Sequence, residues 1–408
     1  MKPEQIMVIA GEASGDTLAA ELVIALRREL TNAQISYTPD TQPLRTGLEP
    51  RFFGAGGPRM KDAGVELAFD LTRHSVIGIS DALKNYFKFR RLFNQLVKLA
   101  AERQPQIIVC VDFSGFNRRF AEAIKNRVRS RRGWFHDWQP KIVQFVSPQV
   151  WASRAERAYQ IAGDYDLLLS IFPFEKDWYA QRVPQLRVEF VGHPMIDRFA
   201  NGNSQPVRRD SENASIANRP PRILLLPGSR ESELKRHLPV MLGALKLIRQ
   251  KQPQAAAKMV LPNQSLAQLA KTIGVNEKLE IQIGDLPSAL AQTDLAIAST
   301  GTVTMECAFF GVPTVTMYKT SAMTYQIAKR VVKVKSLTMP NILAGEEVFP
   351  EFIQNAATPE NISSAALSLL QNDSRRVEIK TQLAKIISTL GEPGATERAA
   401  KIIAGLIK

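Results

Sequence analysis

Short apolar segments alternate with longer amphipathic ones along the chain, and this alternation runs through twice. The pattern is typical of α/β proteins with mainly parallel sheets. The expected strands are Ile6–Ala10, Ile107–Val111, Ile142–Val146, Leu167–Ile171 and Val188–Val191 in the first series, and Arg222–Leu226, Ala257–Leu261 and Leu295–Ser299 in the second. The expected helices are Thr17–Leu30, Leu83–Ala100, Arg118–Arg129, Phe174–Arg182 and Glu231–Gln250.

A polar stretch, residues 201–218, separates the two series, and its Ser, Asn and Arg content indicates a linker. A chain of 408 residues also exceeds the size at which one hydrophobic core usually keeps growing. We therefore predict two Rossmann-like domains, residues 1–200 and 220–370, with parallel sheets that face a central cleft. Residues 37–50 and 127–140 are predicted to be surface insertions. Ligands of open parallel sheets bind at the carboxyl ends of the strands, so the residues that follow each strand are the functional candidates.

The composition is that of a soluble globular protein, with 45% hydrophobic and 23% charged residues. No apolar run approaches the roughly 18 residues that span a bilayer, and residues 1–10 are predicted to form a strand rather than a signal peptide. The net charge of +14 attracts nucleic acid, phosphorylated small molecules or an anionic membrane, and charge alone does not choose among them. Cys110 and Cys307 lie in apolar stretches and are expected to be buried free thiols of a reducing cytosol.

Four strand-to-helix junctions carry glycines and hydroxyl groups. The loop Gly11–Asp16 follows the first strand, and its glycines and the start of the next helix suit an anion, although the spacing is neither the dinucleotide-binding nor the P-loop pattern. In a later loop, Gly228 allows a ligand to approach the backbone, and Arg230 can hold a phosphate through two hydrogen bonds. Ser229 is either a phosphate ligand or a helix cap.

A third loop carries Ser299, Gly301 and Thr302, whose hydroxyl groups and backbone N–H groups suit a pyrophosphate. Glu306 lies one turn further and is expected to accept hydrogen bonds from ribose hydroxyls. This loop and the Gly228–Arg230 loop together predict a site for a nucleoside diphosphate in the second domain. Asn341 offers a carboxamide to a sugar, although asparagine is also a common turn residue.

No constellation of metal ligands stands out, and no metal or other cofactor is expected. Asp164-Tyr165-Asp166 matches the D-x-D pattern of metal-dependent glycosyltransferases, but it precedes a strand rather than following one, and a tight Mg²⁺ site needs several oriented oxygens. Two cysteines and four histidines also argue against a structural zinc site. Arg230 and helix dipoles are expected to stabilise a leaving diphosphate instead.

Taken together, these segments resemble the lipid-A-disaccharide synthase family. In the family's order, they are Ala10–Asp16 (A-G-E-A-S-G-D), Gly56–Met60 (G-G-P-R-M), Ser147–Trp151 (S-P-x-V-W), Phe172–Lys176 (F-P-F-E-K), Val191–Pro194 (V-G-H-P), Pro227–Arg230 (P-G-S-R), Ser299–Cys307 (S-G-T-x-x-x-E-C with Thr300 added) and Pro340–Gly345 (P-N-x-L-A-G), followed by Pro350, Glu351 and Gln354. Such an ordered set, running from about residue 6 to residue 354, is far more specific than any single motif.

The resemblance implies a GT-B fold, with the acceptor on the N-terminal domain, UDP on the C-terminal one, and a last helix, about residues 375–408, that returns to the first domain. It implies an inverting transfer of 2,3-diacylglucosamine from UDP-2,3-diacylglucosamine to 2,3-diacylglucosamine 1-phosphate, which gives lipid A disaccharide 1-phosphate and UDP. One direct displacement needs one general base. The implied UDP contacts are Gly228, Ser229, Arg230, Ser299, Gly301, Thr302 and Glu306, and the implied sugar contacts are Ser14, Gly15 and Asn341.

The chain departs from the family's pattern at the expected base. The family commonly has Asp-x-x-Asp-Phe-Asn after the second strand of our first series, and Gly115 stands here in place of the second acid. Loss of a positioned base typically costs about 10²–10⁴-fold in rate. Asp112, Glu12 and Asp16 are therefore the alternative bases, although Asp16 also fits a helix cap and Asp112 an orienting role.

Both implied substrates are acylated, so contact with a membrane is expected. Two basic clusters fit either an interfacial helix on anionic lipid or an ordinary helix with a solvated basic face: Lys84, Lys88, Arg91 and Lys98, and Lys329, Arg330, Lys333 and Lys335. We expect a cytoplasmic protein, peripheral on the cytoplasmic face of the inner membrane. A homodimer is left open, and no nucleic-acid partner is expected, since that interpretation rests on charge alone.

Three other functions remain compatible with the sequence. The first is a GT-B glycosyltransferase with a different acceptor, which Gly115 favours and which product analysis distinguishes. The second is a UDP-sugar 2-epimerase, which would isomerise the UDP-sugar without any acceptor. The third is a non-catalytic UDP-sugar-binding paralogue, which would bind UDP without turnover.

Overall fold

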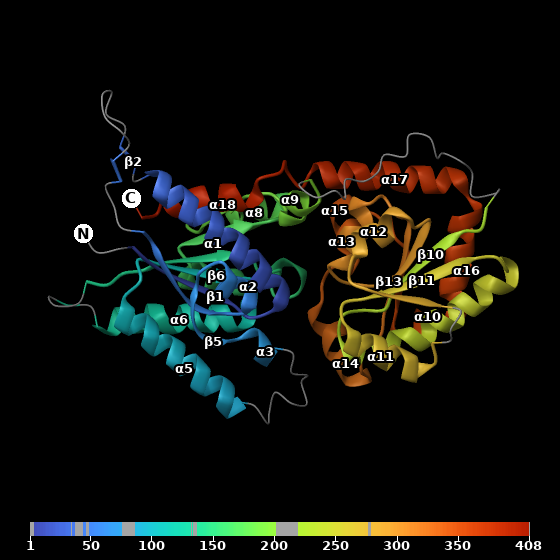
Figure 1. Ribbon diagram of the computed structural model, residues 1–408, viewed down its shortest axis with the longest axis horizontal. Coiled ribbons are helices and arrows are strands. Elements are labelled where there is room, and N and C mark those ends of the chain that lie inside the picture. Colours follow the sequence, from blue (N-terminus) through green and yellow to red (C-terminus); the bar gives the residue numbers. More distant parts are fainter. Residues whose placement is uncertain are drawn as a thin grey trace. The chain divides into compact units, whose positions relative to one another are not determined.

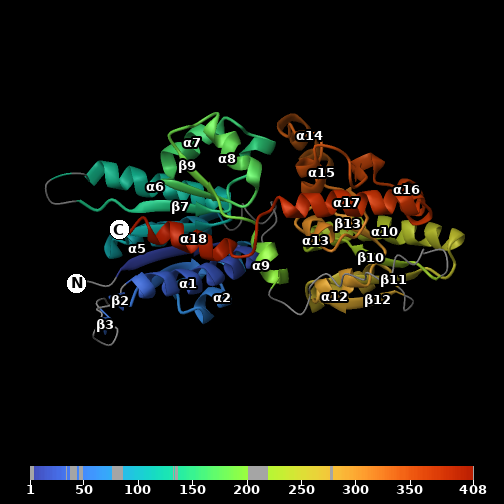
Figure 2. The same ribbon diagram turned by 90° about the horizontal axis from the view of Figure 1, so that it is seen from above.

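The computed structural model describes residues 4–33, 35–36, 44–45, 49–75, 86–131, 133, 137–200, 219–275 and 279–407. The chain divides into two compact units: the N-terminal unit is Met1–Asp197 with Leu390–Lys408, and the C-terminal unit is Arg198–Thr389. Each unit is a parallel sheet covered by helices (Figure 1 and Figure 2). The linker expected at residues 201–218 lies outside the described residues.

The N-terminal unit contains a seven-stranded sheet in the order β5-β4-β1-β6-β7-β8-β9, in which every pair of neighbours is parallel. Its strands are β1 (Gln5–Ala10), β4 (Arg51–Gly56), β5 (Glu66–Asp70), β6 (Ile107–Val111), β7 (Lys141–Phe145), β8 (Leu167–Ser170) and β9 (Arg187–Phe190). In a separate two-residue pair, β2 (Ile35–Ser36) lies directly before the first expected insertion and β3 (Leu44–Arg45) lies within it; most of that insertion is outside the described residues.

Helices cover both faces of this sheet, with α1 and α18 on one face and α5 and α6 on the other (Figure 1). The helical elements of the unit are α1 (Ala13–Ala33), α2 (Pro58–Asp62), α3 (Thr72–Ser75), α5 (Tyr86–Arg103), α6 (Ser114–Arg131), η1 (Val150–Ala152), α7 (Arg157–Asp164), α8 (Pro173–Ala180), α9 (Pro194–Ala200) and α18 (Ala395–Ala404). The second expected insertion is shorter than predicted, because residues 127–131 continue α6; residues 132 and 134–136 lie outside the described part.

The end of the chain belongs to the N-terminal unit, where α18 packs against α1. The Asp197 carboxylate accepts the N–H of Gly394 at 2.6 Å and that of Thr396 at 3.2 Å, so it fixes the start of α18. The segment that belongs to this unit is shorter than the 375–408 expected from the sequence. Helix α17 (Asp373–Ser388) lies in the C-terminal unit, because its apolar residues Ile379, Leu383 and Ile386 are buried in that core.

The C-terminal unit contains a six-stranded parallel sheet in the order β12-β11-β10-β13-β14-β15, which is the strand order of dinucleotide-binding folds. Its strands are β10 (Arg222–Leu226), β11 (Ala256–Leu261), β12 (Glu280–Ile283), β13 (Leu295–Ser299), β14 (Thr314–Tyr318) and β15 (Glu351–Ile353). Its helical elements are α10 (Glu231–Lys251), α11 (Gln264–Ile273), α12 (Leu286–Ala291), α13 (Val303–Phe309), α14 (Ala322–Val331), α15 (Met339–Ala344), η3 (Gln354–Ala356), α16 (Pro359–Gln371) and α17.

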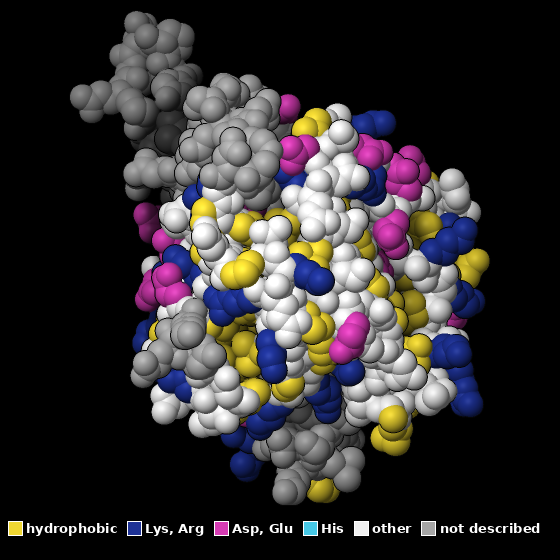
Figure 3. All heavy atoms as spheres, turned by 90° about the vertical axis from the view of Figure 1, so that its right-hand side faces the viewer, with side chains coloured by type: hydrophobic (Ala, Val, Ile, Leu, Met, Phe, Trp, Pro, Cys, Tyr) yellow, Lys and Arg dark blue, Asp and Glu magenta, His cyan; other side chains and the backbone are white. Residues whose placement is uncertain are grey.

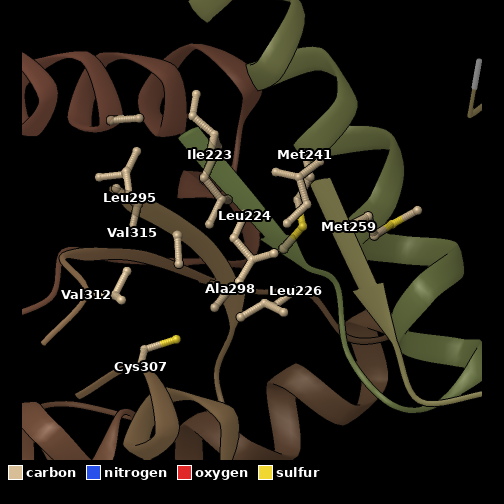
Figure 4. Close-up of a cluster of buried hydrophobic side chains, with 14 of the residues drawn as sticks. Ile223, Leu224, Leu226, Met241, Met259, Leu295, Ala298, Cys307, Val312 and Val315 are labelled. Atoms are coloured by element: carbon tan, nitrogen blue, oxygen red, sulfur yellow. The ribbon is translucent and has the colours of Figure 1, made fainter. Parts of the chain in front are cut away.

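The core of the C-terminal unit explains why β10, β11 and β13 could be predicted from the sequence, whereas β12, β14 and β15 were not. Consecutive residues of β10 are buried because helices cover both faces of a parallel sheet. Figure 4 shows Ile223, Leu224 and Leu226 of β10 among Met241, Met259, Leu295, Ala298, Cys307, Val312 and Val315. Cys307 and Cys110 are both buried and free, as expected, and burial raises the pKa of Cys307 to about 12. Among the described residues, no helix is long and apolar enough to cross a bilayer.

Candidate active-site residues in each unit

In each sheet the strand order reverses at one point, and ligands of open parallel sheets bind beside such points. In the N-terminal sheet the reversal lies between β1 and β6, which are followed by Gly11–Asp16 and Asp112–Asn117. In the C-terminal sheet it lies between β10 and β13, which are followed by Pro227–Arg230 and Ser299–Thr302. The loops selected from the sequence therefore border the two reversal points.

Asp16 joins the first of these loops to the segment that begins α2. Its carboxylate accepts the N–H of Gly57 at 2.7 Å, that of Arg59 at 3.0 Å and that of Met60 at 3.1 Å, and the residue is only 2% exposed. A Cβ on Gly57 would lie 2.6 Å from Asp16 Oδ2, so this position requires glycine. Both carboxylate oxygens of Asp16 therefore cap α2 rather than its own helix, and this use of the carboxylate disfavours Asp16 as the base.

Asp112 directly follows β6 and has a strained backbone conformation. Its φ is 48° and that of Phe113 is 44°, a left-handed region that costs a non-glycine residue about 1 kcal/mol or more. The Asp112 carbonyl accepts hydrogen bonds from Asn117 Nδ2 at 2.7 Å and from Gln144 Nε2 at 3.0 Å, and these two amides support the strained turn. Burial raises the pKa of the Asp112 carboxyl above its ordinary value. Strain and a raised pKa at the end of a strand are typical of functional groups.

The other N-terminal candidates differ in how close they come to Asp112. A Cβ built on Gly15 would lie 3.6 Å from Asp112 Cβ, so the loops after β1 and β6 are adjacent. Glu12 is half-buried and Ser14 is exposed, and neither side chain makes a hydrogen bond within the described part of the unit. Gly115 is exposed in the first turn of α6, and a Cβ there would meet nothing within 4 Å.

In the C-terminal unit, the loop Gly228–Arg230 is folded around the side chain of Glu233. Glu233 Oε2 accepts the N–H of Ser229 at 3.0 Å and that of Arg230 at 3.3 Å. Gly228 has a φ of 121°, and a Cβ on it would lie 2.5 Å from the same carboxylate oxygen. Glycine is therefore required at position 228 so that the Glu233 side chain can pack against the loop. Neither Ser229 nor its hydroxyl caps α10, since the N-cap residue is Arg230, and the Arg230 side chain is 66% exposed beside Glu233.

The loop after β13 presents a carboxyl group of unusual basicity. Gly301 has a φ of 151° and open space beside it, while Ser299 is buried and Thr302 is exposed. Glu306 follows on α13 and is half-buried; among the described residues no hydrogen bond to its carboxylate is present. Burial raises the pKa of Glu306 to about 7, and the charge of Arg198 acts in the opposite direction.

Asn341 does not offer its carboxamide to a ligand. Its Nδ2 donates to Phe349 O and to Glu351 Oε1, both at 2.8 Å, and its Oδ1 accepts the N–H of Val348 at 2.9 Å and that of Phe349 at 2.8 Å. All four hydrogen-bonding positions of the amide are used, and the residue is 2% exposed. Asn341 therefore joins the P-N-x-L-A-G segment to β15, and this use of its amide disfavours it as a sugar contact.

Three residues that position the C-terminal loops were given no role from the sequence, although Gln354 was noted as part of the family's pattern. His237 is fully buried, with Nδ1 2.8 Å from Pro227 O, and its Nε2 accepts the N–H of Lys319 at 3.0 Å, so it joins the loops after β10 and β14. Gln354 bonds the N–H and the carbonyl of Thr320 at 3.1 and 3.0 Å. Glu233 was visible as part of a helix start, but no pattern revealed that it folds back on the loop.

The D-x-D sequence lies away from both reversal points, before β8. Asp164 ends α7 and pairs with Arg118 at 3.1 Å, while Asp166 pairs with Lys125 at 2.7 Å and accepts the N–H of Ile142 at 2.8 Å. These carboxylates are held by cations and backbone. Within the described ranges, no group of three or more His, Cys, Asp or Glu residues is arranged to hold a metal ion.

Two helices expose apolar and basic side chains together. On α5, Phe87 is 77% exposed and precedes the exposed residues Lys88 and Arg91; Lys84 of the expected basic cluster lies outside the described residues. Helix α14 has no buried residue at all, and it exposes Met323 by 74% and Ile327 by 55%. On the face drawn in Figure 3, by contrast, basic, acidic and hydrophobic side chains are interspersed.

The fold is shared with solved nucleotide-sugar enzymes. MurG from Acinetobacter baumannii is similar with a TM-score of 0.55 and 15% identity, over 99% of this chain and 100% of that one. A UDP-GlcNAc 2-epimerase from Neisseria meningitidis bound to UDP-GlcNAc is similar with a TM-score of 0.53 and 12% identity, over 100% of this chain and 99% of that one. These likenesses define the class by fold: the protein has the GT-B architecture.

Sequence comparison gives the family. The family model described as lipid-A-disaccharide synthetase (LpxB) matches residues 6–405. The chain is 32% identical to a lipid-A-disaccharide synthase from Myxococcus xanthus over 99% of this chain and 98% of that protein, and 33% identical to one from Trichlorobacter lovleyi over 100% and 98%. The chain belongs to the lipid-A-disaccharide synthase family. It is accordingly a UDP-sugar-dependent glycosyltransferase of lipid A disaccharide synthesis, and the 2-epimerase alternative is not favoured.

Proposed function

We propose that the C-terminal unit binds UDP-2,3-diacylglucosamine and the N-terminal unit binds 2,3-diacylglucosamine 1-phosphate, and that Asp112 is the general base of the transfer. The observation that carries the proposal is that the family's segments border the reversal point of each sheet. The carboxylate of Asp16 and the amide of Asn341 are held by internal hydrogen bonds, whereas Asp112 provides a buried carboxyl of raised pKa, the kind of base that such a transfer requires.

On the donor side, Arg230 and Glu306 are the principal contacts. The exposed Arg230 guanidinium stands at the start of α10 and can bind the pyrophosphate through two hydrogen bonds. The Glu306 carboxyl has no internal hydrogen bond among the described residues and can accept from the ribose hydroxyls. Gly228, Ser229, Ser299, Gly301 and Thr302 complete the proposed UDP contacts, with Arg230 stabilising the charge that develops on the leaving UDP.

On the acceptor side, Asp112 takes the role of the family's usual acid, whose position is occupied here by Gly115. A base is most effective when its pKa lies near the working pH, and burial moves the pKa of Asp112 in that direction. The acceptor hydroxyl attacks the anomeric carbon, its proton passes to the Asp112 carboxylate, and the bond to UDP breaks on the opposite side. Gly15 and Ser14, on the adjacent loop, are the proposed sugar contacts beside Asp112. Glu12 remains the second candidate for the base, since Asp16 is occupied.

The acylated substrates must be taken from a bilayer, so we place the protein peripherally on the cytoplasmic face of the inner membrane. The exposed side chains of α5 and α14 support this placement, because basic residues next to exposed apolar ones suit anionic lipid. Each basic residue near such a surface contributes about 1 kcal/mol.

The test is to incubate the purified full chain with UDP-2,3-diacylglucosamine and 2,3-diacylglucosamine 1-phosphate and to detect the disaccharide by mass spectrometry. Arg230→Ala should abolish product, while Arg236→Ala, a matched exposed arginine on the same helix, should retain it. An isomerised UDP-sugar formed without acceptor, or UDP binding with no disaccharide at any enzyme concentration, would contradict the proposal.

A further inference from the structure

Two segments that the proposed donor and base sites do not use lock together in the N-terminal unit. Trp151, at the end of the S-P-x-V-W segment, donates its Nε1–H to Glu175 Oε1 of the F-P-F-E-K segment at 3.0 Å. The Trp151 ring also packs edge-on against Phe174, with centroids 5.0 Å apart, and Glu175 is fully buried. This lock fixes η1, the short helix that follows β7, and hence fixes the residues that come directly after it.

Those residues begin a cluster of arginines. The N–H of Arg154 donates to Val150 O inside η1 at 2.9 Å, and the N–H of Arg157 donates to Arg154 O at 2.9 Å, so both arginines extend from the locked segment into α7. Arg118 reaches the same helix from α6, since its Nη1 lies 3.1 Å from Asp164 Oδ2. Arg119 is its neighbour on α6. We call Arg118, Arg119, Arg154 and Arg157 the arginine cluster.

The cluster carries more positive charge than its surroundings neutralise. The nearby acids Asp164 and Glu122 both pair with Arg118. Burial, followed by the charges of Arg154 and Arg118, lowers the pKa of Arg157, and Glu156 opposes this only in part. Among the described residues, the side chains of Arg154 and Arg157 have no hydrogen bond or ion pair, although both are half-buried.

A half-buried guanidinium surrounded by like charges is unfavourable unless an anion completes it. Guanidinium groups bind phosphate through paired hydrogen bonds, and several of them together suit a phosphate with two negative charges. Arg154 and Arg157 lie on the elements that follow β7, so their backbone is at the edge of the sheet where β6 ends next to Asp112, whereas the Arg118 guanidinium extends from α6 to Asp164 at the end of α7. That edge is where an open parallel sheet binds its ligand.

We propose that Arg154 and Arg157, supported by Arg118 and Arg119, form the binding site for the phosphomonoester of the acceptor sugar. The proposal rests on the proposed function for the identity of that acceptor. In this proposal the S-P-x-V-W and F-P-F-E-K segments hold Arg154 and Arg157 at the acceptor edge of the N-terminal sheet.

The experiment measures binding rather than turnover. Short-chain 2,3-diacylglucosamine 1-phosphate and the same compound without its phosphate are titrated into the full chain by calorimetry, without donor. The wild-type chain should prefer the phosphorylated compound. Arg157→Gln and, separately, Arg154→Gln should weaken its binding by about 10- to 100-fold and leave the phosphate-free compound unaffected, as expected for loss of charged hydrogen bonds.

The matched control is Arg187→Gln, which removes the same charge from an arginine of this unit that is paired with Glu189. Equal binding of the two compounds by the wild-type chain, or equal loss in Arg187→Gln and Arg157→Gln, overturns the proposal. Because the like charges of the cluster repel one another, Arg157→Gln should not lower the Tm. A fall in Tm would therefore reveal a folding defect in this variant, and the binding measured for Arg154→Gln would then test the proposal. Arg157→Lys should bind with intermediate affinity, since it keeps the charge but loses the paired geometry.

A second arm separates an acceptor phosphate from a lipid headgroup. If Arg157→Gln reduces flotation with phosphatidylglycerol vesicles but does not change binding of the short-chain phosphorylated compound, the cluster binds membrane lipid and the proposal is wrong. Failure of the proposed function would look different: the wild-type chain would bind the phosphorylated sugar through the arginines and yet form no disaccharide with the donor.

Discussion

Replacing Gly115 by Asp tests the assignment of the base directly, because it restores an acid at the position where the family commonly has one. The substitution is sterically free: Gly115 is exposed, and a Cβ there would meet nothing within 4 Å. It also lies in the first turn of α6, which contains no acidic residue. An acid can therefore be added without disturbing Asp112, Asn117 or Gln144.

The expected effect on stability follows from this position. An acidic side chain near a helix N-terminus contributes about 0.3–1 kcal/mol, and removing a glycine from a helix contributes about 0.5–1 kcal/mol, offset in part by the lower helix propensity of Asp. The sum is about 1 kcal/mol, or roughly 2–4 °C in Tm for a unit of this size. Gly115→Asn isolates the charge, and its difference from Gly115→Asp should vanish as the pH falls below about 4.

The expected effect on catalysis is small. If Asp112 already removes the proton, a second acid should change kcat by no more than a few-fold at neutral pH. A rise of about 10²-fold or more would mean that the wild-type chain lacks a working base, and the assignment of Asp112 would be wrong. A fall in Tm would instead refute the reasoning that the site around Gly115 is open. Thermal denaturation and initial rates of disaccharide formation measure the two effects on the same samples.

Three further predictions follow from the described geometry. Asp112→Asn should reduce kcat by about 10²–10⁴-fold with UDP binding intact, as measured by initial rates and calorimetry. The kcat/KM of the wild-type chain should be lost as the pH falls through the pKa of Asp112, which burial raises above that of an ordinary aspartate. Gly228→Ala should lower the free energy of unfolding by about 1–3 kcal/mol in denaturant titration, because φ is 121° and the new Cβ would meet Glu233, whereas Gly274→Ala, also at positive φ but with open space, should show only the backbone strain. Glu306→Gln should raise the free energy of unfolding by up to about 3 kcal/mol at pH 8 and leave it unchanged at pH 4. Burial raises the pKa of Glu306 from 4.5 to about 7, so the stability linked to its proton is complete below pH 4.5 and is lost as the pH rises through 7. Equal effects of the substitution at both pH values would contradict this prediction.

Strands β10, β11 and β13 and the central strands of the N-terminal unit could be predicted because they are largely apolar runs. Strands β12, β14 and β15 of the C-terminal unit were not predicted, since they are short or carry polar residues between the apolar ones. Strand β10, for example, has the predicted bounds Arg222–Leu226. Strand β4 was missed because half of its R-F-F-G-A-G sequence is small residues, and Gly54 is needed there since a Cβ would lie 1.9 Å from Val8 O. Strand β5 was missed because it is a partly exposed edge strand with an acid at each end.

The candidate site could be predicted as a set of loops but not as a set of roles. Sequence position placed Asp16, Asn341 and Asp112 equally well at the ends of strands or in loops. What separates them is where their hydrogen-bonding groups are used: the carboxylate of Asp16 and the amide of Asn341 are occupied by backbone groups that lie 41 and 7 residues away in the nearest cases. Pairings over such separations leave no periodic signal in the sequence.

The family's segments contain polar groups that are hydrogen-bonded internally and others that are not. In several segments one polar residue stabilises the loop through internal hydrogen bonds: Asp16 binds the Gly57 segment, Glu233 binds the Gly228 loop, and Asn341 binds β15. A group that already has its partners stabilises the loop and is poorly suited to meet a substrate, because each internal bond must break first. Asp112, Glu306 and Arg157 have the opposite character: each is partly buried, with a pKa shifted by that burial, and their charged groups are not held by such a set of backbone bonds. Burial without internal compensation is the condition under which a ligand stabilises a charge most, and for that reason these three residues, rather than the loops as a whole, are where substitutions should separate binding and catalysis from folding.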